Sequence, residues 1–212
     1  MLRIDRRSRL IVLVATLLLA AAYVLPLWRI ELDAPQYPEG LGLRIWINQI
    51  TGVKPNDLNS INNLNHYIGM HRIEPDAIPE LRLMPWFIGA MIGLGLITAF
   101  AGRRWLLTTW AVVLGLGAAV GIADFWKWGY DYGHHLDPDA AIKIPGMSYQ
   151  PPLIGTKQLL NFHAASWPDI AGWLAILAVG LVVAVTILEW KRAGAALQRP
   201  AMRTQPAREV IA

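Results

Sequence analysis

The sequence predicts an all-α membrane protein with four transmembrane helices and two long outward-facing loops that form a small cap. The first observation is that the apolar residues gather in blocks without charge, each about the twenty residues that a helix needs to cross the hydrocarbon of a bilayer. The second is that these blocks lack the polar face that a helix of a soluble domain shows. The predicted spans are Leu10–Trp28, Leu83–Gly102, Trp105–Ala123 and Ile170–Leu188.

The first block also has features of a cleavable signal peptide. Arginines precede it, and Ala20–Ala22 offers small residues at which a peptidase could cut. The uncharged run nevertheless continues to Trp28, which is longer than the apolar core of a typical signal peptide. We therefore expect the block to be retained as a membrane anchor.

The positions of lysine and arginine predict the orientation. Basic residues precede the first block, separate the second from the third, and follow the fourth, so all three groups share one side when both termini are cytoplasmic. We expect a multi-pass protein of the bacterial inner membrane. The net charge of +4 then reflects topology and contact with anionic lipid, and it does not indicate nucleic acid. The groups are Arg3, Arg6, Arg7 and Arg9; Arg103 and Arg104; and Lys191, Arg192, Arg199, Arg203 and Arg208.

This topology divides the chain into six parts. We expect a cytoplasmic N-terminus with the first helix, an outer loop, a helical hairpin, a second outer loop, the fourth helix and a disordered cytoplasmic tail. Their bounds are 1–29, 30–82, 83–124, 125–168, 169–190 and 191–212.

The first outer loop contains the most suggestive cluster of side chains. "GLRIWINQITG" predicts a short strand, and "KPNDLNSINNLNHYIGM" predicts a short helix that Asn56 or Asp57 could cap. On that helix His66 and Met70 would project from one face, with His71 at its end. Imidazole and thioether ligands suit copper, particularly Cu(I). The alternative is that they are ordinary packing residues near a membrane interface.

The second outer loop supplies further donors. His134 and His135 follow a run of aromatic residues, Met147 lies in an irregular "KIPGMSYQPP" segment, and His163 precedes the last span. All five histidines of the chain therefore fall in the outer loops. We predict an outer copper site with His66, Met70, His71, Met147 and His163 as ligands. His134 and His135 are weaker candidates, and Glu39 is a candidate oxygen ligand or hydrogen-bonding partner of a ligand.

Several other chemistries are disfavoured by residues that the chain lacks. Without cysteine, disulfides, thiolate metal sites and C-x-x-C-H haem attachment are excluded. No H-E-x-x-H, G-x-S-x-G or P-loop sequence occurs. The glycines of the second and third blocks instead indicate close helix packing. We therefore expect a protein that is not an enzyme.

Three stretches, "YPEGLGLRIWINQITG", "INNLNHYIGM" and "IPGMSYQPPLIGTKQLLNF", resemble those of a family of small membrane proteins. Genes of that family often neighbour those for nitrous oxide reductase and its copper-supply factors. The resemblance covers both loops and implies a role near copper-site assembly or electron supply for a periplasmic cuproenzyme. His66, Met70, Met147 and His163 lie in its characteristic stretches.

Three functions follow from these observations. The first is an accessory protein that binds copper or delivers it to a periplasmic cuproenzyme or copper chaperone, at a site shared by the two loops. The second is a membrane subunit of a redox complex, with Trp126, Trp128 and His163 at the edge of a quinol site. The third is a docking anchor that binds no metal.

Overall fold

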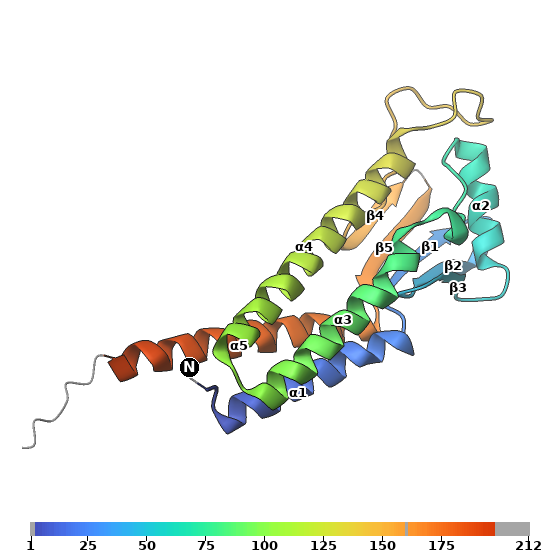
Figure 1. The fold of residues 1–212 in the computed structure, drawn as a ribbon. Coiled ribbons are helices and arrows are strands. Elements are labelled where there is room, and N and C mark those ends of the chain that lie inside the picture. Colours follow the sequence, from blue (N-terminus) through green and yellow to red (C-terminus); the bar gives the residue numbers. More distant parts are fainter. Residues whose placement is uncertain (1–2, 160, 198–212) are drawn as a thin grey trace, which may run out of the picture.

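A computed structural model describes residues 3–159 and 161–197, and it corrects the predicted fold class (Figure 1). The prediction of an all-α protein with four transmembrane helices is wrong, because the two predicted outer loops form a five-stranded antiparallel sheet. The helices are α1 (Arg6–Ala20), α2 (Asp57–Ile68), α3 (Glu80–Ala101), α4 (Arg104–His134) and α5 (Ile170–Leu197). The strands are β1 (Trp28–Ala34), β2 (Tyr37–Ile45), β3 (Ile50–Gly52), β4 (Gly155–Leu159) and β5 (Phe162–Pro168). Short 3-10 helices cover Ala21–Tyr23 and Pro75–Ala77.

Among the described residues, three helices are long and apolar enough to cross a membrane: α3, α4 and α5. The first predicted span, Leu10–Trp28, forms a shorter helix than expected, because α1 has 15 residues and its last turn tightens into the 3-10 helix before Pro26. At 1.5 Å per residue α1 reaches about 22 Å, less than the roughly 30 Å of a hydrocarbon core. In contrast α4 has 31 residues and continues eleven residues past Ala123, the predicted end of the third span.

The helices α1, α3, α4 and α5 share one apolar core. Val12 and Ala15 of α1 are fully buried against Leu107 and Trp110 of α4 and neighbouring residues of α3 and α5. The indole Nε1 of Trp110 donates to the carbonyl of Met91 at 3.0 Å, so its polar atom is satisfied inside the core. The helices approach closely at Gly95, where a Cβ atom would collide with Thr16 and lie 2.8 Å from the Trp110 ring.

The sheet joins two segments that are far apart in the sequence. Its strand order is β3-β2-β1-β5-β4, so the central strand β1 pairs with β2 on one side and with β5 on the other. In the second pairing Trp28 lies opposite Pro168 and Asp33 lies opposite His163. Both predicted outer loops therefore contribute strands to one sheet, which connects the end of α1 to the start of α5. The expected strand in "GLRIWINQITG" divides into β2 and β3, with a turn at Trp46–Gln49 between them.

The two faces of the sheet have different surroundings. Ile30, Leu32, Leu41 and Leu43 belong to an apolar cluster with Ile61 of α2, so α2 covers this face. The same face continues across β5, where the buried Ser166 hydroxyl donates to the carbonyl of Leu153 and accepts from the indole of Trp28. The other face carries exposed side chains, including Arg29, Glu31, Asp33, Arg44, His163 and Trp167.

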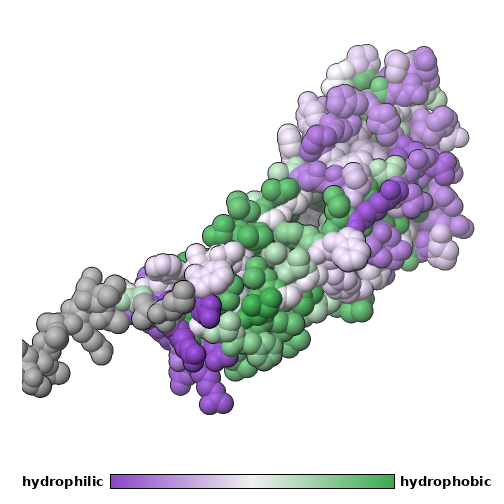
Figure 2. Space-filling model, viewed as in Figure 1, coloured by the Kyte–Doolittle hydropathy of each residue, from purple (hydrophilic) through white to green (hydrophobic). Residues whose placement is uncertain are grey.

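The surface of the molecule is divided into three zones (Figure 2). On the face that Figure 2 shows, an apolar band covers the helices and separates a hydrophilic end, formed by the sheet and α2, from a second hydrophilic end near the start of α1. The exposed apolar side chains of the band include Leu10, Leu17, Ile97, Phe100, Val112, Leu116, Ile176 and Leu177. Such a band matches the surface that a bilayer covers. It also explains why large apolar residues are exposed on helices that pack so tightly elsewhere.

Candidate functional site

The predicted ligands of the first loop lie at the C-terminal end of α2. The helix ends in a Schellman motif: Gly69 has φ of +80°, its amide donates to the His66 carbonyl, and the Met70 amide donates to the Asn65 carbonyl at 2.9 Å. Met70 therefore lies beyond the helix. The expectation that His66 and Met70 project from one helical face is wrong for this reason, although the helix itself is confirmed. It packs through Leu58, Ile61 and Leu64.

Hydrogen bonds join this end of α2 to the second outer segment. The Asp137 amide donates to the Gly69 carbonyl at 2.8 Å, and the Ile142 amide donates to the Tyr67 carbonyl at 2.9 Å. The hydroxyl of Tyr132, in the last turn of α4, donates to the Arg72 carbonyl at 3.3 Å. We call the two joined segments, residues 66–72 and 130–149, the outer junction. It lies at the end of α4 that is distant from the start of α1 (Figure 1).

Six of the seven predicted ligands belong to the outer junction. Four are exposed and two are half-buried, so their donor atoms lie at or near the surface. The exposed ones are His66, His71, His134 and His135, and the half-buried ones are Met70 and Met147. The seventh, His163, is exposed on β5 opposite Asp33 of β1, on the sheet face that α2 does not cover. Glu39 is exposed on β2, and its carbonyl accepts a hydrogen bond from Lys54.

Aromatic side chains of α4 orient three of these histidines. The ring of His134 stacks on that of Tyr130 at 4.0 Å, and its Nδ1 lies 3.0 Å from the Tyr130 carbonyl. Because a carbonyl only accepts, Nδ1 supplies the proton of this hydrogen bond, and Nε2 is the ring nitrogen left to face a metal. His135 lies with its Nδ1 3.6 Å from Asp131, and His71 packs edge-on to Tyr132 at 6.1 Å.

Within residues 3–159 and 161–197, no three His, Asp or Glu side chains gather closely enough to hold a metal ion. Methionine sulfur is not among these groups, so a site that combines imidazole nitrogen with methionine sulfur stays a prediction. The structure shows that residues 66–72 and 130–149 lie close together, which their spacing in the sequence could not show.

The aromatic residues proposed for a quinol site belong to α4 and not to a loop. Trp126 stacks on Tyr130 at 5.5 Å, and Trp128 packs against Tyr132 at 5.2 Å. The crevice beside Trp126 has a volume of about 20 Å³, which holds about one water molecule and no quinone ring. His163 lies on the far face of the sheet. The crevice beside Trp126 is therefore too small for a quinol, and Trp128 and His163 do not line it.

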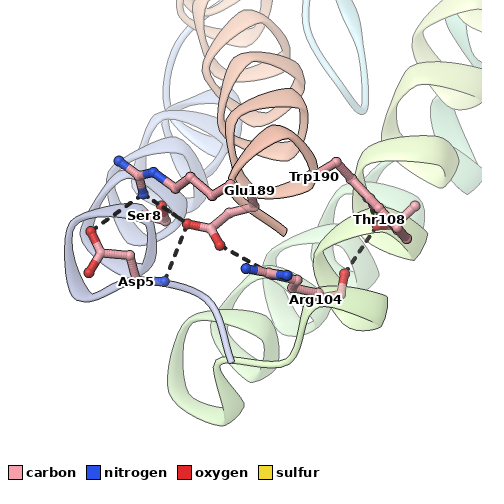
Figure 3. Close-up of polar contacts among 7 residues, drawn as sticks. Asp5, Ser8, Arg104, Thr108, Glu189 and Trp190 are labelled. Atoms are coloured by element: carbon pink, nitrogen blue, oxygen red, sulfur yellow. Dashed lines mark hydrogen bonds and ion pairs between the residues drawn. The ribbon is translucent and has the colours of Figure 1, made fainter. Parts of the chain in front are cut away.

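A second polar cluster, which the sequence analysis missed, lies at the opposite end of the molecule (Figure 3). Glu189 of α5 is 2% exposed, and its Oε1 accepts from the Ser8 hydroxyl at 2.6 Å and from Arg192 at 3.1 Å. Its Oε2 lies 3.4 Å from Nε of Arg104. The Asp5 amide also donates to Oε1 at 3.3 Å. We call residues 3–9, 102–104 and 189–192 the basic end, because seven of the eleven arginines in the described residues lie there.

One feature of the sequence could have indicated this cluster: Glu189 follows directly after the apolar run that ends at Leu188. We predicted that the last span ends near Leu188 and that the tail begins at Lys191, but α5 continues to Leu197. Glu189 thus lies inside a helix that contacts both α1 and α4, where a charge needs partners. The remainder of the predicted disordered tail, residues 198–212, lies outside the described residues.

No protein-family model matches this chain, and no curated protein matches it. The resemblance to the copper-linked family stays a prediction that rests on the three quoted stretches.

Proposed function

We propose that this chain is an accessory protein of the bacterial inner membrane, with its termini at the cytoplasmic side and its sheet domain outside. Two observations support this arrangement. The apolar band separates the two hydrophilic ends (Figure 2). Basic residues from three parts of the chain meet at one end, where Ile4 and Gly102 are hydrogen-bonded and Glu189 pairs with Arg104 and Arg192. That end is the cytoplasmic one by the positive-inside rule.

We further propose that the outer junction binds Cu(I) and passes it to an outer partner, a cuproenzyme such as nitrous oxide reductase or a copper chaperone. The observation that carries this proposal is the hydrogen-bonded contact between the segments that hold six candidate donors. Exposed imidazole groups beside half-buried thioether groups suit a transfer site, because the partner's ligands must reach the metal. Soft donors also favour Cu(I) over Zn²⁺ and Ca²⁺. Copper is the proposed cofactor, or cargo, of this site.

The experiment is a Cu(I) competition titration of the purified protein in detergent, with a chromophoric chelator as the competitor. Met70→Leu, His71→Ala and Met147→Leu should each lower the affinity about tenfold or more. The leucine replacements remove the sulfur and keep most of the packing volume. Met70→Leu combined with Met147→Leu should cost less than the sum of the two single losses of binding free energy, because ligands of one site act together.

His163→Ala is the matched control. It removes an exposed histidine of the same domain from the sheet face away from the outer junction, so Cu(I) affinity should stay at the wild-type value. Unchanged affinity in all three junction variants would contradict the proposal. A loss in His163→Ala as large as in His71→Ala would show that the site is not at the outer junction.

The exposed sheet face favours a second candidate, the docking anchor that binds no metal. Its side chains alternate in charge, with Arg29 and Glu31 exposed on β1 and Trp167 exposed on β5 beside Arg29. A rim of charges with an aromatic residue is a common composition for a protein interface. In cells that lack the chromosomal copy, docking predicts that Arg29→Glu with Trp167→Ala abolishes support of the cuproenzyme. The combination of Met70→Leu, His71→Ala and Met147→Leu should then have no effect. The copper proposal predicts that the triple variant fails.

A further inference from the structure

We propose that an anionic phospholipid binds in a groove between α1 and α3 at the basic end. The groove has a volume of about 770 Å³ and is lined by Asp5, Arg6, Arg7, Arg9, Leu10, Leu13, Ala99 and Phe100. Its polar lining thus comes from the start of α1, and its apolar lining from both helices. This inference concerns residues distant from the outer junction, and it does not rest on copper binding.

The arginines of the groove differ in whether their guanidinium groups already make hydrogen bonds. Arg9 is already engaged, because its Nε donates to the Ala99 carbonyl and its Nη2 to the Phe100 carbonyl, both at 2.6 Å. It therefore fastens α1 to the C-terminal end of α3. Arg6 and Arg7 are exposed, and within the described residues their side chains make no hydrogen bond or ion pair. Two guanidinium groups are thus free to bind an anion.

The single acidic residue in the lining does not cancel this charge. The Asp5 carboxylate lies 3.5 Å from Arg192, which comes from α5. Asp5 is therefore paired with a cation from outside the groove, and Arg6 and Arg7 keep their net positive charge. A guanidinium group binds phosphate oxygens through two parallel hydrogen bonds, which makes arginine a suitable partner for a phosphate group.

The apolar lining indicates that the anion carries acyl chains. Leu10 is 62% exposed and Phe100 is 72% exposed, although both are large apolar side chains. From them an exposed stripe continues away from the basic end, through Leu17 on α1 and Ile97 on α3. These positions are one or two helical turns from the groove on the same faces, since residues seven and three apart share a helical face. A headgroup held by Arg6 and Arg7 would lay its chains along this stripe.

The position relative to the apolar band agrees with this assignment. The groove lies where the band meets the basic end, because Arg6 and Arg7 belong to the basic end and Leu10 and Phe100 belong to the band. This is the depth of lipid phosphates in a bilayer. Anionic lipids are abundant in the cytoplasmic leaflet, toward which the basic end is predicted to face. A soluble anion has no acyl chain that could contact the apolar stripe. We therefore assign the groove to a phospholipid with one net negative charge, such as phosphatidylglycerol.

Native mass spectrometry tests the proposal on the full-length protein in detergent with equal amounts of phosphatidylglycerol and phosphatidylcholine. Wild-type protein should retain phosphatidylglycerol preferentially. Arg6→Gln with Arg7→Gln should lower that preference about tenfold or more, since each basic side chain near an anionic surface contributes substantially to binding. Arg6→Lys with Arg7→Lys should retain much of it.

Arg103→Gln with Lys191→Gln is the matched control, because it removes two exposed positive charges from the same end without touching the groove lining. This variant should keep the wild-type preference. An equal loss in both double variants would show general charge attraction and would overturn a defined site. Equally tight binding of sn-glycerol 3-phosphate would also overturn it, because the apolar stripe would then contribute nothing.

Discussion

The outer junction and the basic end are held together in opposite ways. At the outer junction, backbone groups of Gly69, Asp137, Tyr67 and Ile142 join the segments, and the histidine side chains stay exposed. At the basic end, the side chain of Glu189 joins three helices and is itself buried. Hydrogen bonds between backbone groups leave the side chains free to bind a ligand. Side chains that hydrogen-bond to one another have fewer atoms left for a ligand. This difference indicates a structural role for Glu189, and it is the reason why we propose the outer junction as the ligand-binding end.

The largest effect is expected from Glu189→Ala. It removes a buried carboxylate and leaves the guanidinium of Arg104, which is largely buried, without its partner. Breaking a buried ion pair from one side typically costs about 3–5 kcal/mol of unfolding free energy. Thermal unfolding in detergent, followed by tryptophan fluorescence, should show a clear loss of stability.

Asp5→Ala is the control for that prediction. Its side chain pairs with Arg192 at 3.5 Å, but both groups are about half exposed, so the loss should stay below about 1 kcal/mol. The Asp5 amide keeps its hydrogen bond to Glu189 in this variant. If Asp5→Ala destabilised the protein as much as Glu189→Ala, the difference between buried and exposed partners would not explain the cluster.

An intermediate effect is expected from Gly69→Ala, which tests the backbone contacts of the outer junction. Gly69 has φ of +80°, and an added Cβ would lie 2.9 Å from the Ala140 side chain and 3.0 Å from the Asp137 backbone. The left-handed backbone conformation alone costs an alanine about 1 kcal/mol. In addition, the clash should push residues 66–72 away from residues 130–149. Hydrogen exchange of the Asp137 and Ile142 amides should accelerate in this variant.

Gly146→Ala provides the comparison, because Gly146 also has a left-handed φ, +76°, yet an added Cβ would meet nothing within 4 Å. This substitution should cost only the conformational strain and leave both amides protected. Equal acceleration in the two variants would mean that the Gly69 contact does not hold the outer junction together.

The smallest effect is expected from Trp190→Phe. This change removes the hydrogen bond from the indole Nε1 to the Thr108 hydroxyl at 3.0 Å, which joins α5 to α4 on an exposed surface (Figure 3). A neutral hydrogen bond of this kind contributes about 1 kcal/mol or less. The same unfolding assay should place this variant near the wild type, and a loss as large as that of Glu189→Ala would contradict the ranking.

The sequence predicts local features of this molecule well. The helix α2 follows from the spacing of Leu58, Ile61 and Leu64, and three of the predicted spans correspond to long apolar helices. Close packing at glycine holds for Gly95 and Gly117, but an added Cβ would meet nothing within 4 Å at Gly93, Gly115 or Gly121. Composition alone cannot tell which glycine faces a neighbouring helix.

The sheet was missed for two reasons. In "WRIELDA" charged residues alternate with Ile30, Leu32 and Ala34, and that pattern indicated a strand, but the segment was interpreted as the start of a loop. Strand β5, "FHAASWP", is rich in small residues and gives a weak signal. Its pairing with β1 joins residues 130 to 140 positions apart, and a single sequence contains no information on such a contact. For the same reason the sequence could not separate His163 from the other predicted ligands.

The most direct test of the proposed function measures on which side of the membrane the outer junction and the basic end lie. The chain has no cysteine, so a single introduced cysteine reports its own position. Ala141→Cys, in the exposed part of the outer junction, should react with a membrane-impermeant maleimide added to cells with a permeable outer membrane. Lys191→Cys, at the basic end, should react only after the inner membrane is opened. The reverse pattern would place the predicted copper ligands in the cytoplasm and contradict the proposed function.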